Sequence, residues 1–442
     1  MSIERPARSM GACIAAALLL ASHTAHAAGP RAITLAEALA MAQKSDVGIV
    51  RADGSARNAR AAVRSSWGAF LPNLTVTGST TRQLNNTGRT TVQNGQVVIL
   101  PSEPWSTNLG ANASLTIFDG GSRFFNMGQA KSNRVSAEVD AAAARWTSAL
   151  STKQAFYNVL AAHETQLAAA AQLDQAKQQR VDAIARTHSK SATRSDSLRA
   201  EISVRNAQLA VTQAAVDLGS ANAALARAVG SLDPVTAALG DTLQATSIAL
   251  DDSTLAKLVE NAPAVQAARA VRDAARDARK AAWSTYLPSV VASWSRNGSG
   301  LGSTPAADPT TLTYTGQLRF GLTFPIFDQF GREQQLTQTA VALENAEADL
   351  RDARLAARQS LTDGLGSFRE ASERVASQSA TVEAAGEDLR VQRERYSLGG
   401  STLLDVLTSQ AALDQARRDL IRARYDQRVA KAQLEALVGR DL

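Results

Sequence analysis

The sequence is poor in cysteine and histidine, and this scarcity excludes several kinds of site. Its one cysteine, Cys13, lies in an amino-terminal segment that we expect to be removed, so the mature chain has no disulfide or thiolate chemistry. Two of the four histidines, His23 and His26, leave with that segment. His163 and His188 lie far apart within helical sequence, which favours solvated helix positions over metal ligands. We therefore expect no metal site and no cofactor.

The sequence also lacks the patterns on which common enzymes depend. It has no phosphate-binding loop, no His-Glu-x-x-His zinc helix and no Gly-x-Ser-x-Gly nucleophile turn. The formal charge of +6 comes from Lys and Arg interleaved with Asp and Glu along helical sequence, which is typical of a solvated surface. We expect neither a catalytic site nor binding to nucleic acid.

No segment of the mature chain approaches the roughly 18 apolar residues that a membrane-spanning helix needs. Any membrane crossing is therefore expected to use strands. The apolar run Ile14–Ala21 follows Arg5 and Arg8 and precedes Ala25-His26-Ala27, which is the pattern of a secretory signal peptide over residues 1–27. We expect the mature chain to leave the cytoplasm.

The chain contains an internal repeat. Trp67–Pro72 returns as Trp283–Pro288, and Ile117-Phe118-Asp119 returns as Ile326-Phe327-Asp328. One offset of 209 residues aligns the second pair and the whole rear half of each repeat without a gap, which chance does not readily produce. The expected organisation is repeat 1 over residues 28–230, a linker over 231–252 and repeat 2 over 253–442.

Each repeat is expected to contain a long helical hairpin. Gln129–Leu218 has neither Gly nor Pro and is rich in strong helix formers, which predicts two helices with a reversal near Ser189–Arg194. The first helix alone would extend roughly 90 Å at 1.5 Å per residue. We expect long helices over about 122–230 and again over about 331–439.

The second helix of the hairpin carries two apolar stripes. One is a heptad seam of Val204, Val211, Leu218 and Leu225 with Ala200, Ala207, Ala214, Ala221 and Ala228, and it predicts close coiled-coil packing. The other is Ile202, Leu209 and Val216, on a different face. Repeat 2 keeps the seam with Leu413, Leu420, Leu434, Ala416, Ala423 and Ala430, although Gln427 interrupts it. Two stripes indicate neighbours on both sides, as in the wall of a cylinder.

The segments between the paired motifs alternate with period two, as strands do. Their side chains are apolar on one face and polar on the other, most clearly over residues 311–324 and 108–117, with weaker partners at Leu74–Leu84 and Ser289–Arg296. This predicts one strand hairpin per repeat, over about 73–118 and 289–327, with exposed loops at Asn85–Pro104 and Asn297–Pro309. The expected lipid-facing side chains are Tyr314, Leu318, Phe320, Leu322 and Phe324.

A sheet with one apolar and one polar face is typical either of a membrane barrel or of a half-buried sheet in a soluble protein. Four strands cannot close a membrane barrel, because the smallest barrels have about eight. If these strands cross a membrane, several copies of the chain must therefore share one barrel. The other hypothesis is a periplasmic structural coiled coil without a pore, which would be soluble without detergent.

In this order the motifs resemble the TolC-like outer-membrane efflux protein family over essentially the whole mature chain. The segments that carry the resemblance are Thr34-Leu35-Ala36-Glu37-Ala38-Leu39, the two Leu-Pro strand entries, Phe118-Asp119-Gly120-Gly121, the long helix pairs, and Tyr396-Ser397-Leu398-Gly399-Gly400-Ser401-Thr402-Leu403-Leu404-Asp405-Val406-Leu407. The resemblance implies a mainly α fold with a transmembrane β-barrel. Three chains would share 12 strands and an α-helical periplasmic tunnel.

The resemblance also implies a function and partners. The protein would be a passive export duct in the outer membrane, extending into the periplasm and surrounded by outer-membrane lipid. A periplasmic adaptor and an inner-membrane pump would open it, within a tripartite efflux pump or a type I secretion system. The duct itself would have no active site.

Asp196 and Asp405 are related by the 209-residue offset and follow the two helix reversals, which in this family lie at the constricted periplasmic end. Three-fold symmetry would turn each into a ring of carboxylates that binds cations. Both also fit a capping box, in which the aspartate only satisfies backbone donors. Tyr396 either braces this gate or packs between helices.

The reversal at Ser397, Leu398, Gly399, Gly400 and Ser401 is the expected adaptor-docking site. The family often has a basic residue where this chain has Ser401, and a second aspartate where it has Thr408, so the usual network of gate ion pairs is not expected in full. The first reversal, His188–Ala192, also departs from the family pattern, and docking is expected to differ between the two reversals.

Aromatic residues gather where the strands meet the helices. The expected membrane-interface set is Trp67, Phe70, Phe118, Trp283, Tyr286 and Phe327. Packing in the core of the junction would explain the same residues. The linker over 231–252 is expected to lie outside the tunnel near its middle.

Overall fold

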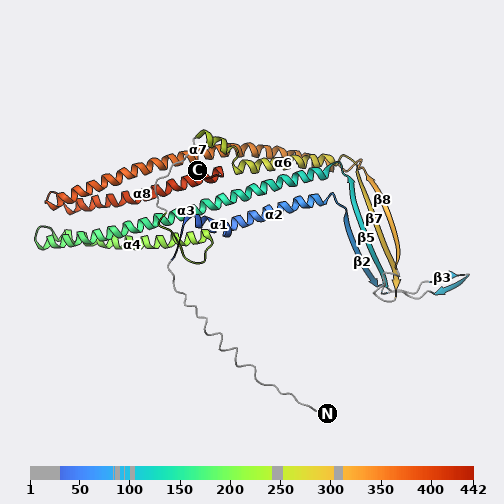
Figure 1. Ribbon diagram of the computed structural model, residues 1–442, viewed down its shortest axis with the longest axis horizontal. Coiled ribbons are helices and arrows are strands. Elements are labelled where there is room, and N and C mark those ends of the chain that lie inside the picture. The colour runs from blue at the N-terminus through green and yellow to red at the C-terminus, as the bar shows by residue number, and fades with distance from the viewer. Residues whose placement is uncertain are drawn as a thin grey trace, which may run out of the picture.

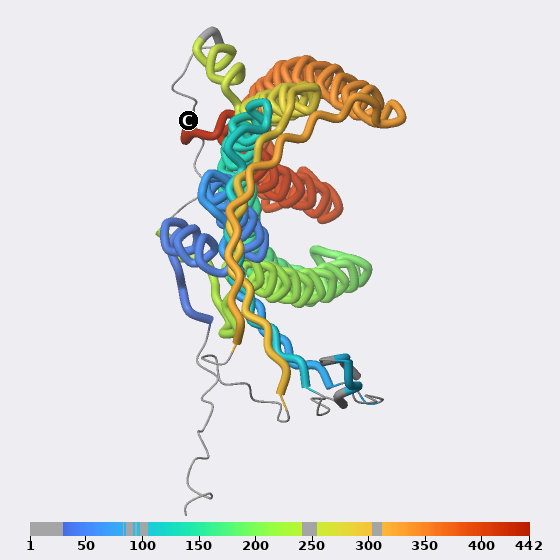
Figure 2. The backbone as a smooth tube through the Cα atoms, turned by 90° about the vertical axis from the view of Figure 1, so that its right-hand side faces the viewer, coloured from blue at the N-terminus to red at the C-terminus, as the bar shows by residue number. Residues whose placement is uncertain are grey.

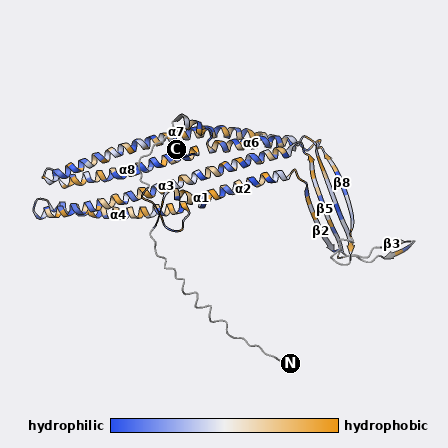
Figure 3. Ribbon diagram, viewed as in Figure 1, coloured by the Kyte–Doolittle hydropathy of each residue, from blue (hydrophilic) through white to orange (hydrophobic). Residues whose placement is uncertain are grey.

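The computed structural model describes residues 30–82, 84, 90–93, 95–99, 105–240, 252–302 and 312–442. The chain forms two long helical hairpins that run side by side, with a strand sheet at the opposite end from the hairpin turns (Figure 1). Hydrophilic and hydrophobic residues alternate along the helices in short steps (Figure 3). In the described part of the chain, no helix is both long and apolar enough to cross a membrane. The expected signal peptide lies outside the described residues.

The helices repeat in a fixed order. They are α1 (Leu35–Ser45), α2 (Val47–Gly68), α3 (Ser122–His188), α4 (Arg194–Val229), α5 (Asp252–Val259), α6 (Pro263–Ser284), α7 (Gly331–Ser397) and α8 (Leu403–Val438). The long helices α3 and α7 each have 67 residues, and their partners α4 and α8 each have 36. The predicted hairpins and the predicted 209-residue relation between them are therefore confirmed.

The helices form a curved row rather than a closed bundle (Figure 2). Near the turns the order is α4, α3, α8, α7, and near the sheet α2 and α6 take the places of α4 and α8. Helix α3 thus packs against both repeats, whereas α4 and α7 do not pack against each other and stand at the two ends of the row.

The main sheet has four antiparallel strands in the order β2 (Asn73–Arg82), β5 (Trp105–Phe118), β7 (Ser289–Gly302) and β8 (Thr313–Thr323). Its central pair, β5 with β7, joins the two repeats. A small hairpin of β3 (Thr90–Gln93) and β4 (Gln96–Ile99) extends beyond it (Figure 1). Separately, β1 (Arg31–Ile33) pairs in parallel with β6 (Val235–Ala237) at the start of the predicted linker.

Two predicted loops contain more regular structure than expected. The strand expected to end at Arg296 continues as β7 to Gly302, although its last residues are mostly Gly and Ser. Pairing with β5 continues to Gly302, and those backbone hydrogen bonds outweigh the weak strand propensity of the segment. The loop predicted over Asn85–Pro104 contains the β3–β4 hairpin. The rest of these loops, and linker residues 241–251, lie outside the described residues.

The cores lie along the helix seams. In repeat 1, Phe156 and Leu225 are fully buried together with Ile33 of β1. In repeat 2, Val265 and Leu434 occupy the corresponding cluster. A largely buried ion pair joins the repeats, with Lys153 Nζ of α3 lying 2.5 Å from Glu435 Oε2 of α8. Burial alone would lower the pKa of Lys153, but the hydrogen bond and charge of Glu435 outweigh it and raise this pKa.

The predicted seam of α4 packs against α3, and the predicted second apolar stripe is exposed to solvent in the single chain. Val204 and the seam alanines from Ala200 to Ala221 are buried, whereas Ile202 and Leu209 are 59% and 69% exposed. Gln427, which interrupts the seam of α8, is buried, and its Nε2 donates to Ser372 Oγ at 3.0 Å. The polar residue is therefore accommodated by a hydrogen bond across the α7–α8 seam.

Candidate functional site

The two hairpin turns have the same backbone but different side chains. Lys190 and Gly399 are equivalent under the 209-residue offset, and both have positive φ, 59° and 79°. In the first turn a lysine therefore adopts a conformation that favours glycine. Leu398 in the second turn is 83% exposed. The expected docking segment thus exposes an apolar side chain just before two glycines, whereas the first turn carries a positively charged lysine.

Each predicted gate aspartate forms a complete capping box. The Thr193 N–H and hydroxyl donate to Asp196 Oδ2 at 2.9 and 2.8 Å, and the Asp196 N–H donates to Thr193 Oγ1 at 3.3 Å. Thr402 and Asp405 make the same three bonds at 2.8, 2.7 and 3.3 Å. Capping is thus a structural role of both aspartates, and it leaves each carboxylate with lone pairs for a further ligand.

The environment of Asp405 keeps it ionised. The backbone N–H of Thr402 and then its hydroxyl lower the pKa of Asp405, and Arg395 acts in the same direction. Asp405 is exposed in the single chain, and Asp196 is half-buried. A carboxylate held in the charged form and fixed at the first turn of a helix is suited to cation binding if copies of the chain bring such groups together.

Tyr396 lies between the two hairpins. The Arg186 guanidinium of α3 stacks over its ring at 4.4 Å, and Arg186 Nη1 donates to the Tyr396 carbonyl oxygen at 3.0 Å. The ring also packs against Ala183, Ala200 and Leu403, which come from α3, α4 and α8. The structure thus gives Tyr396 the packing role, and its contacts join the two hairpins at their ends.

Sequence reasoning missed a polar chain one to three turns above Tyr396. Arg393 Nη2 donates to Gln410 Oε1 at 2.9 Å, and Gln410 Nε2 donates to Asp414 Oδ1 at 2.9 Å. Gln175 of α3 contacts both Arg393 and Gln410, and the orientation that satisfies its amide turns its oxygen toward Arg393. Burial raises the pKa of Asp414, whose other oxygen has no partner among the described residues. Polar residues among the apolar positions of α8 were the available signal.

A groove lies beside the contacts of Tyr396 and Arg393 with α3. It has a volume of about 550 Å³ and is lined mainly by polar side chains of α3 together with Arg393, Tyr396, Leu403 and Val406. It opens between the two hairpins near their ends. Solvent and partner side chains therefore have access to the contacts that hold one hairpin against the other.

The sheet has one apolar and one polar face, as predicted. The predicted lipid-facing residues Leu318, Phe320 and Leu322 are 64%, 65% and 71% exposed. Across the sheet they pair with Trp294, Ala292 and Val290, so the apolar surface continues over β7. Tyr314 lies on the same face, and Phe324 follows the end of β8. In the single chain, none of the described residues covers this face.

The predicted interface aromatics form ring pairs at the junction between sheet and helices. Trp67 with Phe70, Trp283 with Tyr286, and Phe327 with Phe330 have ring centroids 5.9, 5.4 and 5.6 Å apart. Exposed side chains predominate, with Trp67 at 56%, Phe118 at 43%, Trp283 at 55% and Phe327 at 69%. In the single chain these four residues are therefore surface groups rather than core residues.

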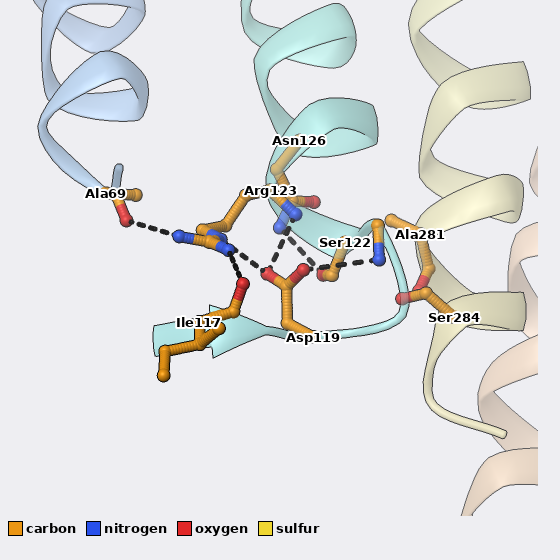
Figure 4. A network of polar contacts seen from close by, with 9 residues as sticks. Ala69, Ile117, Asp119, Ser122, Arg123, Asn126, Ala281 and Ser284 are labelled. Atoms are coloured by element: carbon orange, nitrogen blue, oxygen red, sulfur yellow. Dashed lines mark hydrogen bonds and ion pairs between the residues drawn. The ribbon is translucent and has the colours of Figure 1, made fainter. Parts of the chain in front are cut away.

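Two arginines that the sequence analysis did not single out fix this junction. Arg123 Nε lies 3.1 Å from Asp119 Oδ2, and its other nitrogens donate to the carbonyls of Ala69 and Ile117 (Figure 4). Its guanidinium also lies over Phe70 at 5.0 Å. One arginine therefore connects the end of α2, the end of β5 and the start of α3.

Repeat 2 places a related arginine 209 residues later. Arg332 Nε lies 3.2 Å from Asp328 Oδ2, and its other nitrogens donate to the carbonyls of Pro325 and Ile326 at 3.1 and 3.2 Å. Its guanidinium lies over Tyr286 at 4.8 Å. In repeat 2 the charge-assisted bonds therefore join the end of the strand to the start of α7, and the Tyr286 ring supplies the contact with the end of α6.

Comparison with known proteins agrees with this architecture. The structure is similar to that of CusC, with a TM-score of 0.80 and 17% identity over 92% of each chain. It is similar to the outer membrane protein VceC of Vibrio cholerae, with a TM-score of 0.74 and 19% identity over 92% of this chain and 96% of that one. The open-state MtrE outer membrane channel of Neisseria gonorrhoeae gives 0.76 and 19% over 92% and 89%. No curated protein matches the sequence at a significant level.

The family model described as outer membrane efflux protein matches residues 38–231 and 254–440. The two matched segments correspond to the two structural repeats and together cover most of the chain. They agree with the helix order, the four-strand sheet and the resemblance found in the sequence. The chain is therefore an outer-membrane protein that belongs to the outer membrane efflux protein family.

Proposed function

We propose that this protein is the outer-membrane channel of a tripartite efflux pump. Three copies form one barrel of 12 strands, and their helices continue the barrel as a tunnel into the periplasm. The channel is a passive duct without a catalytic site. A periplasmic adaptor opens it, and an inner-membrane pump supplies the energy and selects the cargo. Membership of an efflux family favours this role over type I secretion.

The observation that carries the proposal is the open sheet. Within the described residues its edge strands β2 and β8 pair only inward, and its apolar face is uncovered. Unpaired edges and exposed apolar faces are unstable in water. Joining β8 of one copy to β2 of the next closes the edges, and lipid covers the apolar face, which satisfies both requirements together.

The helix row supports the same closure. Near the turns the row ends in α4 and α7, each of which packs against a neighbour on one side only. The bare stripe of α4 contains Ile202 and Leu209, and α7 exposes Val341 and Leu355 by 48% and 64%. Packing α4 and α2 of one copy against α7 of the next would bury these side chains at the same time as the sheet closes.

The test is the protein mass of the particle extracted from outer membranes into detergent, measured by light scattering corrected for bound detergent. Three chains per particle are expected. Phe320→Arg should prevent assembly, because a charge on the lipid face costs about 2 to 4 kcal/mol near mid-bilayer. Gln317→Arg, on the polar face of the same strand, is the matched control and should assemble. A soluble monomer or dimer that needs no detergent would overturn the proposal in favour of a coiled coil without a pore.

We also propose that the aspartates gate the tunnel as well as cap helices. In a trimer, Asp196 and Asp405 would each form a ring, and carboxylates about 6 Å apart repel by roughly 3 kcal/mol per pair at an effective dielectric near 20. A closed end then requires cations or donors beside the rings. Asp405→Ala should raise the conductance in planar bilayers or reduce block by divalent cations. Unchanged conductance and block with lower thermal stability would leave capping as the only role.

The segment from Ser397 to Ser401 is proposed as the adaptor-docking site. Leu398 offers an exposed apolar contact, and Gly399 lets a partner backbone approach closely. Leu398→Asp should weaken binding of the cognate adaptor while the trimer remains intact. Lys190→Asp at the other turn is the control, and an equal loss from both variants would contradict a preference for the second turn.

A further inference from the structure

The four strands of the main sheet are unusual in their charge. Strands β2, β5, β7 and β8 contain no aspartate or glutamate and three arginines, Arg82, Arg296 and Arg319. Elsewhere in the chain basic and acidic residues are interleaved. The described strands therefore carry only positive charge, and the face on which each arginine lies decides what that charge can do.

The strand register places Arg319 on the polar face. Arg319 pairs with Ser293 of β7, Ser293 pairs with Ser114 of β5, and Ser114 pairs with Asn73 of β2. Because side chains alternate along a strand, directly paired residues share a face. The rest of this face consists mainly of hydroxyl and amide side chains, with only Val291 and Leu301 as apolar members.

The other two arginines lie on the apolar face. Arg296 pairs with Ala111 and Gly316, and its guanidinium lies over the Tyr314 ring at 5.2 Å. Arg82, at the end of β2, lies over its cross-strand partner Trp105 at 5.5 Å. Among the described strands, Arg319 is thus the one charged side chain on the polar face.

Within the described residues, Arg319 is exposed and forms no ion pair. In water, charges about 10 Å apart still interact through the roughly 10 Å screening length at 0.1 M salt. A narrow water-filled passage lined by a guanidinium group concentrates ions of the opposite sign.

We propose that Arg319 forms a ring of three guanidinium groups in the lumen of the barrel and makes this section of the duct attract anionic solutes. The inference rests on the proposed trimeric channel, in which the polar face becomes the lumen. Solutes that carry a carboxylate, sulfate or phosphate group are then concentrated in the barrel. Small cations are disfavoured there, at the opposite end of the molecule from the aspartates of the helix turns.

The absence of cysteine from the expected mature chain allows a local test. Gln317→Cys places one thiol on the polar face, two residues from Arg319. The probes are an anionic and a cationic methanethiosulfonate of similar size, applied to trimers reconstituted in liposomes. The measured quantity is the ratio of their reaction rates, which reports the potential beside the thiol and does not depend on the state of the periplasmic end.

With Arg319 present, the anionic reagent is expected to react faster, and adding Arg319→Gln should lower the anionic-to-cationic ratio roughly fivefold at 0.1 M salt. Arg296→Gln in the same background is the matched control, since its charge lies on the other face. An unchanged ratio after Arg319→Gln would overturn the inference, as would an equal effect from Arg296→Gln. Particle mass and conductance test the duct separately. A monomer without conductance would overturn the channel itself, whereas a conducting trimer with an unchanged ratio overturns the arginine ring alone.

Discussion

Helix α4 of repeat 1 and helix α8 of repeat 2 have equal lengths and equivalent seams, yet they bury different amounts of surface. Helix α8 has α7 on one side and α3 on the other, whereas α4 packs mainly against α3 among the long helices. The difference lies in position rather than in the helix itself. The two repeats are similar units, and the one at the end of the row retains a face that another copy can cover.

Because of this asymmetry, equivalent residues of the two repeats lie in different surroundings. Under the 209-residue offset, Glu201 and Arg205 of α4 correspond to Gln410 and Asp414 of α8. Glu201 pairs with Arg180 and Arg205 at 3.1 and 3.0 Å in partly exposed surroundings. Gln410 and Asp414 are buried against α3. A solvated ion pair in one repeat is thus replaced by a buried, partly satisfied network in the other.

The two repeats use glycine at opposite ends of the molecule. At the sheet end, repeat 1 places Gly120 and Gly121 at positive φ, where repeat 2 has Gln329 and Phe330. At the hairpin end, repeat 1 has Lys190 where repeat 2 has Gly399. Each repeat therefore keeps a non-glycine residue in the left-handed region at one end only.

The largest expected effect concerns the bare face of α4. Leu209→Glu should abolish the trimer, because burying a leucine contributes about 1.5 to 3 kcal/mol at each of three interfaces and a buried carboxylate reverses the sign. Light scattering in detergent measures the loss. Gln208→Glu, on the flank of the same helix, should leave the trimer intact. Trimers of Leu209→Glu would contradict the packing of α4 against α7 of another copy.

The next effect separates the two sheet-end turns. Gly120 has a φ of 67°, and a Cβ at this position would lie 2.4 Å from the Ser284 carbonyl oxygen. Gly120→Ala should therefore cost more than the roughly 1 to 2 kcal/mol of the backbone conformation alone. Gln329→Gly at the equivalent position should instead stabilise repeat 2 by about 1 kcal/mol. Thermal unfolding measures both, and equal signs for the two variants would show that the turns are not equivalent.

A third prediction separates the two polar networks by pH. Burial raises the pKa of Asp414, so the folded chain binds this proton more readily than the unfolded chain, and stability should rise as pH falls through the raised folded pKa toward the unfolded value of about 3.9. Asp414→Asn should remove this dependence and add on the order of 1 kcal/mol at neutral pH. The unfolding midpoint measured across this range checks it, and an unchanged pH dependence in the variant would rule out Asp414 as its source.

Glu201 should behave with the opposite sign. Its hydrogen bond to Arg180, followed by the charges of Arg205 and Arg180, lowers the pKa of Glu201. Its contribution is present above the unfolded pKa of about 4.3 and is lost as pH falls through the lower folded value. Glu201→Gln should therefore reduce the loss of stability below pH 4, as measured by the same unfolding series.

The smallest effect concerns the hairpin turns. Lys190→Gly should stabilise the first turn by about 1 kcal/mol or less, and Gly399→Ala should destabilise the second by a similar amount. Both positions are exposed, so contacts contribute little. Differential scanning calorimetry of the trimer is the measurement, and destabilisation by Lys190→Gly would indicate that the lysine makes a contact worth more than its strained backbone.

The sequence predicted the parts of the fold that depend on local periodicity. The helix hairpins, the repeat offset and the two faces of β8 follow from spacing within one segment. The extension of β7 to Gly302 could not be predicted in this way, because pairing with distant β5 stabilises it against its own propensity. The same holds for the β3–β4 hairpin, which lies in a sequence otherwise typical of loops.

The candidate site was predictable to the extent that its motifs repeat. The capping boxes of Asp196 and Asp405 were visible from spacing alone. The clamps of Arg123 and Arg332 were not, because most of their partners are carbonyl groups, which leave no side-chain pattern. The network of Asp414 depends on Gln175 of the other repeat, and no local rule connects residues so far apart in sequence.

The order of strands in the sheet also bears on stoichiometry. In a closed trimer the joint between β5 and β7 within a chain and the joint between β8 and β2 of the next chain would alternate around one ring. The hairpin turns would then number six, alternately bearing lysine and glycine at one backbone position. A partner that distinguishes these two turns has three places to bind, and a partner that tolerates both has six.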